Sequence, residues 1–155
     1  MSDLKSRIDS DIKIAMRAKD KLRLMTLRML NAALKQAQVD GPSELRDQAL
    51  GNDQIITVIQ KMIKERRYSA EQYRQGGAED RAIQEDNEIE VLKVYMPKPL
   101  SDDVLEAEIK RVIESLKATS IRDMGQVMKA LTESLAGRAD MGKVSQLVKS
   151  ILSDQ

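Results

Sequence analysis

The sequence predicts an all-α protein in which an N-terminal four-helix bundle and a C-terminal three-helix bundle are joined by a proline-containing hinge. Apolar residues recur at helical spacing along nearly all of the 155 residues, which is typical of amphipathic helices. No segment shows the strict apolar–polar alternation of a half-buried strand. Pro97 and Pro99 interrupt the pattern, because proline cannot continue a helix. We therefore expect two domains, over residues 1–96 and 97–155.

The first helix is expected over residues 3–18, and Asp20 is a suitable N-cap for a second helix over 21–38. The inner arc of the first helix consists of Leu4, Ile8, Ile12, Ala15 and Met16. The second helix is apolar over more than half of its circumference, which predicts a central, largely buried helix. Its polar stripe consists of Lys21, Arg28 and Lys35.

Residues 39–52 contain two glycines and a proline, and we expect a loop that holds a short helical turn. Asn52 is a suitable cap for a third helix over 53–75, which a pair of glycines ends. A fourth, acidic helix is expected over 78–95. The hinge then follows at residues 96–100.

The C-terminal domain is expected to contain helices over 102–117, 121–135 and 141–153. Each of them has a suitable capping residue in front: Ser101, Ser120 and Asp140. Gly125 lies beside the apolar arc of the middle helix, which predicts a close helix–helix contact at that position.

The composition excludes several kinds of chemistry. The chain has no His and no Cys, which rules out histidine bases, catalytic triads, thiol nucleophiles, disulfides and zinc or iron–sulfur centres. Three Tyr are the only aromatic residues, so the core must be aliphatic. We expect no metal, no cofactor and no catalytic residue, and nothing in the sequence supports independent catalysis.

Two arginines lie on the inner arcs of their helices, where a solvated side chain is not expected. They are Arg23 on the second helix and Arg66 on the third. An unpaired buried charge is costly, so we expect Arg23 or Arg66 to form an ion pair between helices. The expected partners flank the inner arc of the fourth helix: Glu85 and Asp86. The functional alternative is an arginine at the bottom of a cleft that binds an anion.

The charge is unevenly distributed along the chain. Residues 1–75 contain 15 Lys and Arg against 10 Asp and Glu, a net of +5, whereas residues 76–155 carry −4. If the first three helices pack together, their outward cations form a surface suited to a nucleic-acid backbone. The alternative is an ordinary solvated surface. The candidate RNA-binding residues are Lys13, Arg17, Lys19, Lys21, Arg28, Lys35, Lys61, Lys64 and Arg67, with Arg138 and Lys143 in the second domain.

Only three residues can stack on bases: Tyr68, Tyr73 and Tyr95. Binding through shape and phosphates, as with structured RNA, is therefore expected in place of single-strand readout. The first helix also resembles a basic amphipathic membrane helix, but no Trp or Phe anchors it, and we expect no membrane partner. The N-terminal residues lack a signal-peptide core, and no apolar stretch approaches a membrane span, so a cytoplasmic location is expected by default.

Residues 137–143, GRADMGK, match the spacing of a phosphate-binding loop. Val144 stands where that motif needs Ser or Thr, and the preceding residues predict a helix where the motif requires a strand. We therefore interpret this segment as a turn in which Asp140 caps the last helix. Arg138 and Lys143 remain available to an external phosphate.

Several strings of the sequence resemble the YqeY-like family, in order and over nearly the whole chain. They lie at residues 11–30 (DIKIAMRAKDKLRLMTLRML), 60–77 (QKMIKERRYSAEQYRQGG), 95–100 (YMPKPL), 123–128 (DMGQVM) and 137–144 (GRADMGKV). One departure is Met141, which follows Asp140 where the family pattern has Gly. The same domain is similar to the C-terminal tail of GatB, one of the polypeptides that make up the aspartyl/glutamyl-tRNA amidotransferase.

The resemblance implies an all-α fold and work related to tRNA. The first hypothesis is a non-catalytic accessory protein that binds tRNA and assists aminoacylation or tRNA-dependent amidation. The second is a component of a glutamine-dependent tRNA amidotransferase, a carbon–nitrogen ligase whose active sites lie in other chains. The third is a protein–protein adaptor that uses the acidic half. The implied partners are structured tRNA and either an aminoacyl-tRNA synthetase or an amidotransferase.

Overall fold

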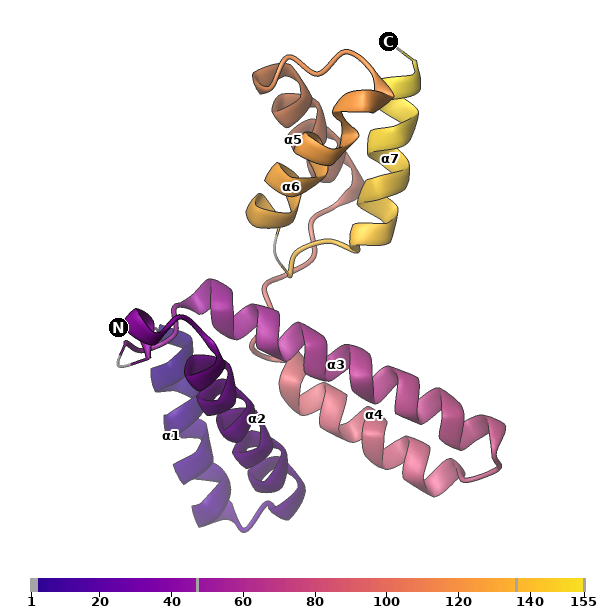
Figure 1. Ribbon diagram of the computed structural model, residues 1–155. Coiled ribbons are helices and arrows are strands. Elements are labelled where there is room, and N and C mark those ends of the chain that lie inside the picture. The colour runs from indigo at the N-terminus through magenta and orange to yellow at the C-terminus, as the bar shows by residue number, and fades with distance from the viewer. Residues whose placement is uncertain (1–2, 47, 136, 155) are drawn as a thin grey trace. The chain divides into compact units, whose positions relative to one another are not determined.

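A computed structural model of the protein describes residues 3–46, 48–135 and 137–154 (Figure 1). In these ranges it contains seven α-helices, two short 3-10 turns and no strand, which confirms the all-α class. The chain divides into two compact units, Met1–Met96 and Pro97–Gln155. Each unit has its own hydrophobic core. Among the described helices, none has the length and apolar character needed to cross a membrane.

The first unit contains α1 (Asp3–Ala18), α2 (Lys21–Asp40), α3 (Asn52–Gln75) and α4 (Glu79–Lys93). Figure 1 shows two helical hairpins, one made of α1 and α2 and the other of α3 and α4. All four helices contribute to one core, to which Tyr95 also belongs. Its largest fully buried side chains are Ile8, Leu27, Leu30, Ile55, Ile59 and Leu92. Most of the apolar arcs that the sequence predicts therefore face inward, but Met16, expected on the inner arc of the first helix, is 51% exposed.

The second helix is less buried than its apolar circumference predicts. Leu27, Leu30 and Leu34 are buried, but Met25 and Met29 are each 43% exposed. One reason is that neighbours cover only one side of α2, which packs against α1, α3 and α4 within this unit. The prediction of a central helix is therefore corrected to a helix with an exposed apolar strip.

Most connections of the first unit follow their expected residue types. The exception is Asn52, which is the first residue of α3 and not its cap, because Gly51 occupies the N-cap position. Asp20 accepts a hydrogen bond from the backbone N–H of Arg23, as an N-cap should. Lys19, just before it, has a φ of 56°, so the tight turn places a non-glycine residue in the left-handed region. Between α2 and α3, residues Ser43–Leu45 form the expected short turn. Asp47, which the predicted loop includes, lies outside the described residues.

The second unit contains α5 (Asp102–Ser115), α6 (Met124–Ser134) and α7 (Met141–Ser153). Its core is aliphatic, with Ile109, Val127, Leu131, Val144 and Val148 fully buried. Ser101 caps α5 and Asp140 caps α7, as expected. Ser120 instead caps a separate 3-10 turn, Ile121–Asp123, that precedes α6.

The predicted close helix contact at Gly125 is wrong. A Cβ built on Gly125 meets no atom of the described residues within 4 Å, because Gly125 lies on the exposed side of α6. Residues 97–101 carry no helix, in agreement with the two prolines. That this segment acts as a hinge remains a prediction.

Candidate nucleic-acid interface

All candidate RNA-binding side chains are exposed. In the first unit they are Lys13 and Arg17 on α1, Lys19 in the turn, Lys21, Arg28 and Lys35 on α2, and Lys61, Lys64 and Arg67 on α3. In the second unit they are Arg138 and Lys143. A cation has to be exposed to meet a phosphate, so exposure permits the predicted role for every member of the set.

The densest group of these cations surrounds the turn between α1 and α2. Arg17, Lys19 and Lys21 fall within five consecutive residues, and Lys13 precedes Arg17 by one helical turn. The left-handed conformation of Lys19 keeps the turn short, so the end of one helix and the start of the next stay close together. Within the described ranges, none of these four side chains forms an ion pair. The turn therefore presents four cations that form no ion pair with a described residue, beside the single carboxylate of Asp20.

A second group continues along α2. Lys21, Arg28 and Lys35 are spaced seven residues apart, which places successive cations roughly 10 Å from each other on one face. The sequence of α2 contains no Asp or Glu before Asp40, so nothing on the helix itself neutralises this stripe. The stripe and the turn share Lys21 and form one basic surface, which we call the α1–α2 basic surface.

Some of the remaining candidate cations form ion pairs within the protein. On α3, the ammonium of Lys61 lies 4.0 Å from the carboxylate of Glu65, while Lys64 and Arg67 form no ion pair with a described residue. In the second unit, Lys143 pairs with Asp102 at the start of α5. Because each of these pairs is exposed to solvent, it reduces the availability of the cation only modestly.

The inward arginines do face carboxylates, but not the expected ones. The Nε atom of Arg66 lies 3.5 Å from Oε2 of Glu88, and a nitrogen of Arg23 lies 3.7 Å from Oδ2 of Asp11. Asp86 pairs instead with Arg74 at the far end of α3. The expected pairing with Glu85 or Asp86 is corrected, because the turn between α3 and α4 sets a register that brings Glu88 opposite Arg66.

Glu85 still belongs to the same electrostatic group. Its pKa is raised, mainly by burial and also by the nearby charge of Glu88, while Arg66 opposes the shift. Glu88 is not among the partners that the sequence predicts, yet its side chain is only 6% exposed. Its position three residues after Glu85, on the same side of α4, was the available signal. The group has a structural role, since it lies between α3 and α4 inside the unit.

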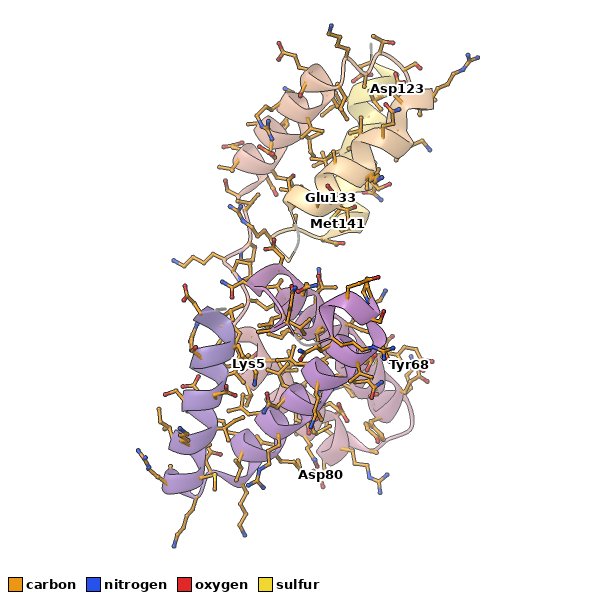
Figure 2. All side chains as sticks on the ribbon, turned by 60° about the vertical axis from the view of Figure 1, so that its left-hand side comes forward. Lys5, Tyr68, Asp80, Asp123, Glu133 and Met141 are labelled. Carbon is orange, nitrogen blue, oxygen red and sulfur yellow. The ribbon has the colours of Figure 1, made fainter. Side chains whose placement is uncertain are left out.

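Two of the three tyrosines are engaged elsewhere and cannot stack freely on bases. The hydroxyl of the buried Tyr95 donates to Asp11 over 2.6 Å, and the guanidinium of Arg7 lies 5.0 Å above its ring. Burial and Asp11 both raise the pKa of Tyr95. Tyr73 lies under Arg81 at 5.9 Å. Tyr68 is 67% exposed and projects from the outer side of α3 (Figure 2).

The segment GRADMGK has the structure of a helix cap. A side-chain oxygen of Asp140 accepts a hydrogen bond of 2.9 Å from the N–H of Gly142, at the start of α7. In Figure 2 the labels of Glu133 and Met141 mark the end of the unit where α6 finishes and α7 begins. A helix precedes the segment where a phosphate-binding loop needs a strand, so the spacing match has no matching fold. Among the described residues, no cluster of three potential ligands suits a metal ion.

The fold and the exposed cations define a class of protein: a small all-helical protein with a basic face in its N-terminal half. A family model described as Yqey-like protein matches residues 5–152. The match covers nearly the whole chain, so the chain belongs to the YqeY family. The resemblance that the sequence strings indicate is thereby confirmed.

The similar curated proteins share a name, altered inheritance of mitochondria protein 41, mitochondrial. The one from Pyrenophora tritici-repentis is 30% identical over 94% of this chain and 79% of its own length. The one from Clavispora lusitaniae is 26% identical over 96% of this chain and 85% of its own length. These names contradict the cytoplasmic location that we expected by default, and that expectation is withdrawn.

Proposed function

We propose that this YqeY-family chain is a non-catalytic accessory protein that binds tRNA and assists an enzyme of aminoacylation or tRNA-dependent amidation. The observation that supports the proposal most directly is the α1–α2 basic surface. Its cations are exposed and form no ion pair with a described residue, and α2 has no acidic residue before Asp40. A surface that leaves its cations without carboxylate partners is suited to an external polyanion.

The ligand is a folded RNA recognised by its shape and its phosphates. Lys and Arg that neutralise phosphates release condensed counterions, which favours binding without base-specific contacts. Tyr68 is the one exposed tyrosine among the three, so stacking on unpaired bases contributes little. In this proposal the aminoacylating or amidating enzyme supplies the chemistry, and this chain supplies binding.

We further propose that the two units are a four-helix and a three-helix bundle joined by a hinge at residues 96–100. The two separate cores support this division. Pro97 and Pro99 stiffen the connection locally and prevent a continuous helix across it. In this arrangement Arg138 and Lys143 contribute RNA contacts from the second unit.

The test is binding of the full chain to bulk folded tRNA across a salt series, with an unstructured RNA of equal length as control. We expect tighter binding to tRNA, with the logarithm of the affinity falling linearly as the logarithm of the salt concentration rises. The slope counts the phosphate contacts. Equal affinity for both RNAs, or no binding at low salt, would overturn the proposal.

A further inference from the structure

The outer face of α2 carries a shallow, open depression whose lining is mostly apolar and comes from α2 alone; we call it the α2 groove. The groove has a volume of about 530 Å³ and is lined by Lys21, Leu24, Met25, Arg28, Met29 and Ala32. Met25 and Met29 are one helical turn apart and each is 43% exposed. Together with Leu24 and Ala32, these two methionines form one contiguous exposed apolar strip along α2.

The edge of the groove is positively charged. Lys21 and Arg28 line it together with the methionines, and neither forms an ion pair with a described residue. Because α2 has no acidic residue before Asp40, the charge is not balanced along the helix. The groove therefore combines an apolar floor with a cationic edge.

At one end of the groove, Met29 contacts a buried side chain of the same unit. The sulfur of Met29 accepts a hydrogen bond from Nη2 of Arg66 over 3.8 Å, and Arg66 in turn lies against Glu88. Met25 has no such contact with a described residue, so its side chain is free to adapt. Methionine is flexible and polarizable, and it is frequent on surfaces that accept partner helices. The groove thus pairs an anchored methionine with an adaptable one.

We propose that this groove binds an acidic amphipathic helix of a protein partner. The partner helix presents apolar side chains, one turn apart, to Met25 and Met29, and its carboxylates meet Lys21 and Arg28. Such a helix matches both properties of the α2 groove, since two helices pack through apolar side chains at helical spacing and pair opposite charges along the edges of the contact. An RNA backbone satisfies the cations alone and leaves the methionines exposed to water.

The partner helix and tRNA share two cations in this arrangement. Lys21 and Arg28 belong both to the groove and to the α1–α2 basic surface. The claim that the partner helix and tRNA exclude each other rests on the proposed function. The claim that the groove binds an acidic helix does not. The binding of an acidic helix by the chain in the absence of RNA therefore tests the groove alone.

The experiment uses the full chain labelled with ¹³C at its methionine methyl groups. The probe is a synthetic helix of roughly five turns, with Leu on one face and Glu along both edges, and its twin carries Lys in place of every Glu. We expect the acidic helix to shift the methyl signals of Met25 and Met29, assigned with M25L and M29L, and its basic twin to leave them unchanged. The single variant M25Q, which spares the contact to Arg66, is expected to weaken binding about tenfold, equivalent to about 1.4 kcal/mol.

The charge requirement is tested with K21E/R28E, which we expect to weaken binding at least tenfold. Its matched control is K129E/K149E, which reverses two exposed lysines of the second unit and should leave the affinity unchanged. Equal binding of the basic twin, absence of binding at about 1 mM, or shifts confined to methyl groups other than those of Met25 and Met29 would overturn the proposal. Shifts of these two methyl signals with tRNA but not with the acidic helix would also overturn it and assign the strip to the RNA surface.

Discussion

The guanidinium of Arg66 on α3 lies 3.5 Å from the carboxylate of Glu88 on α4, and both side chains are almost completely buried. The Nε atom of Arg66 makes no hydrogen bond with a described residue, although it is the atom nearest the carboxylate. The other two nitrogens contact the carbonyl of Met62 and the sulfur of Met29. The pair is thus held by charge more than by aligned hydrogen bonds, and each charge depends on the other for compensation.

Removal of one member of this pair should be more damaging than removal of both. We expect E88L to lower the free energy of unfolding by about 3–5 kcal/mol, because it leaves the Arg66 guanidinium buried without a counter-charge. The double variant R66M/E88L should recover most of that loss. Urea unfolding measures the free energy of unfolding of both variants. The exposed control E90L is expected to change it by less than about 0.5 kcal/mol. A double variant as unstable as E88L would contradict this account.

Glu85 should make stability depend on pH. Its pKa is raised in the folded chain, so the folded state binds its proton more tightly than the unfolded state does. This contribution to stability is therefore complete below the ordinary glutamate pKa, about 4.3, and is lost as the pH rises through the raised value. The free energy of unfolding is measured with urea at a series of pH values. We expect E85Q to remove the part of its decline with rising pH that Glu85 causes. The exposed control E90Q should retain the full decline. If the decline in E85Q is as large as in the unchanged chain, a group other than Glu85 causes it.

The hydroxyl of Tyr95 should contribute measurably to the first unit. It donates to a carboxylate, and a hydrogen bond to a charged group is worth about 1.5–3 kcal/mol. We expect Y95F to lower the free energy of unfolding by about that amount and Y68F, on the exposed side of α3, to have almost no effect. In the double variant Y95F/D11N the two losses should not add, because both remove the same interaction. Additive losses would show that the bond is energetically unimportant.

Asp140 should act as a helix cap and not as part of a nucleotide site. We expect D140A to lower the stability of the second unit by about 1 kcal/mol, which is typical for the loss of an N-cap. D140N and D140S should retain most of the stability, because both side chains accept the same hydrogen bond. Thermal unfolding followed by circular dichroism compares the three variants. Equal losses in all three would contradict a capping role.

The α1–α2 basic surface should carry more of the RNA affinity than the cations of α3. We expect K13E/R17E/K21E to weaken tRNA binding at low salt and to flatten the salt dependence by roughly one unit for each lost phosphate contact. The matched triple variant K61E/K64E/R67E should weaken it less, because Lys61 is already close to Glu65. A filter-binding titration at several salt concentrations measures both. A larger loss in the second variant would move the interface to α3.

Much of the fold was predictable because helices are local structures. The apolar period predicts which side of each helix faces inward, and residues such as Asp20, Ser101 and Asp140 signal the helix starts through their own side chains. The exposure of the candidate cations follows from the same period. The failures concern Gly125, the methionines of α2 and the partners of Arg23 and Arg66, because the surroundings of these residues depend on which other helix lies beside them.

The sequence by itself determined the all-α class, the positions of the helices and the family, because these depend on short-range periodicity, caps and strings of residues. Only the tertiary structure decided that Arg66 pairs with Glu88, that Tyr95 is held by Asp11 and that Met25 and Met29 line an exposed groove. Each of these contacts joins residues from different helices or depends on what lies beside a helix. The register and rotation of packed helices, which set such contacts, result from the fit of whole surfaces and not from any local pattern.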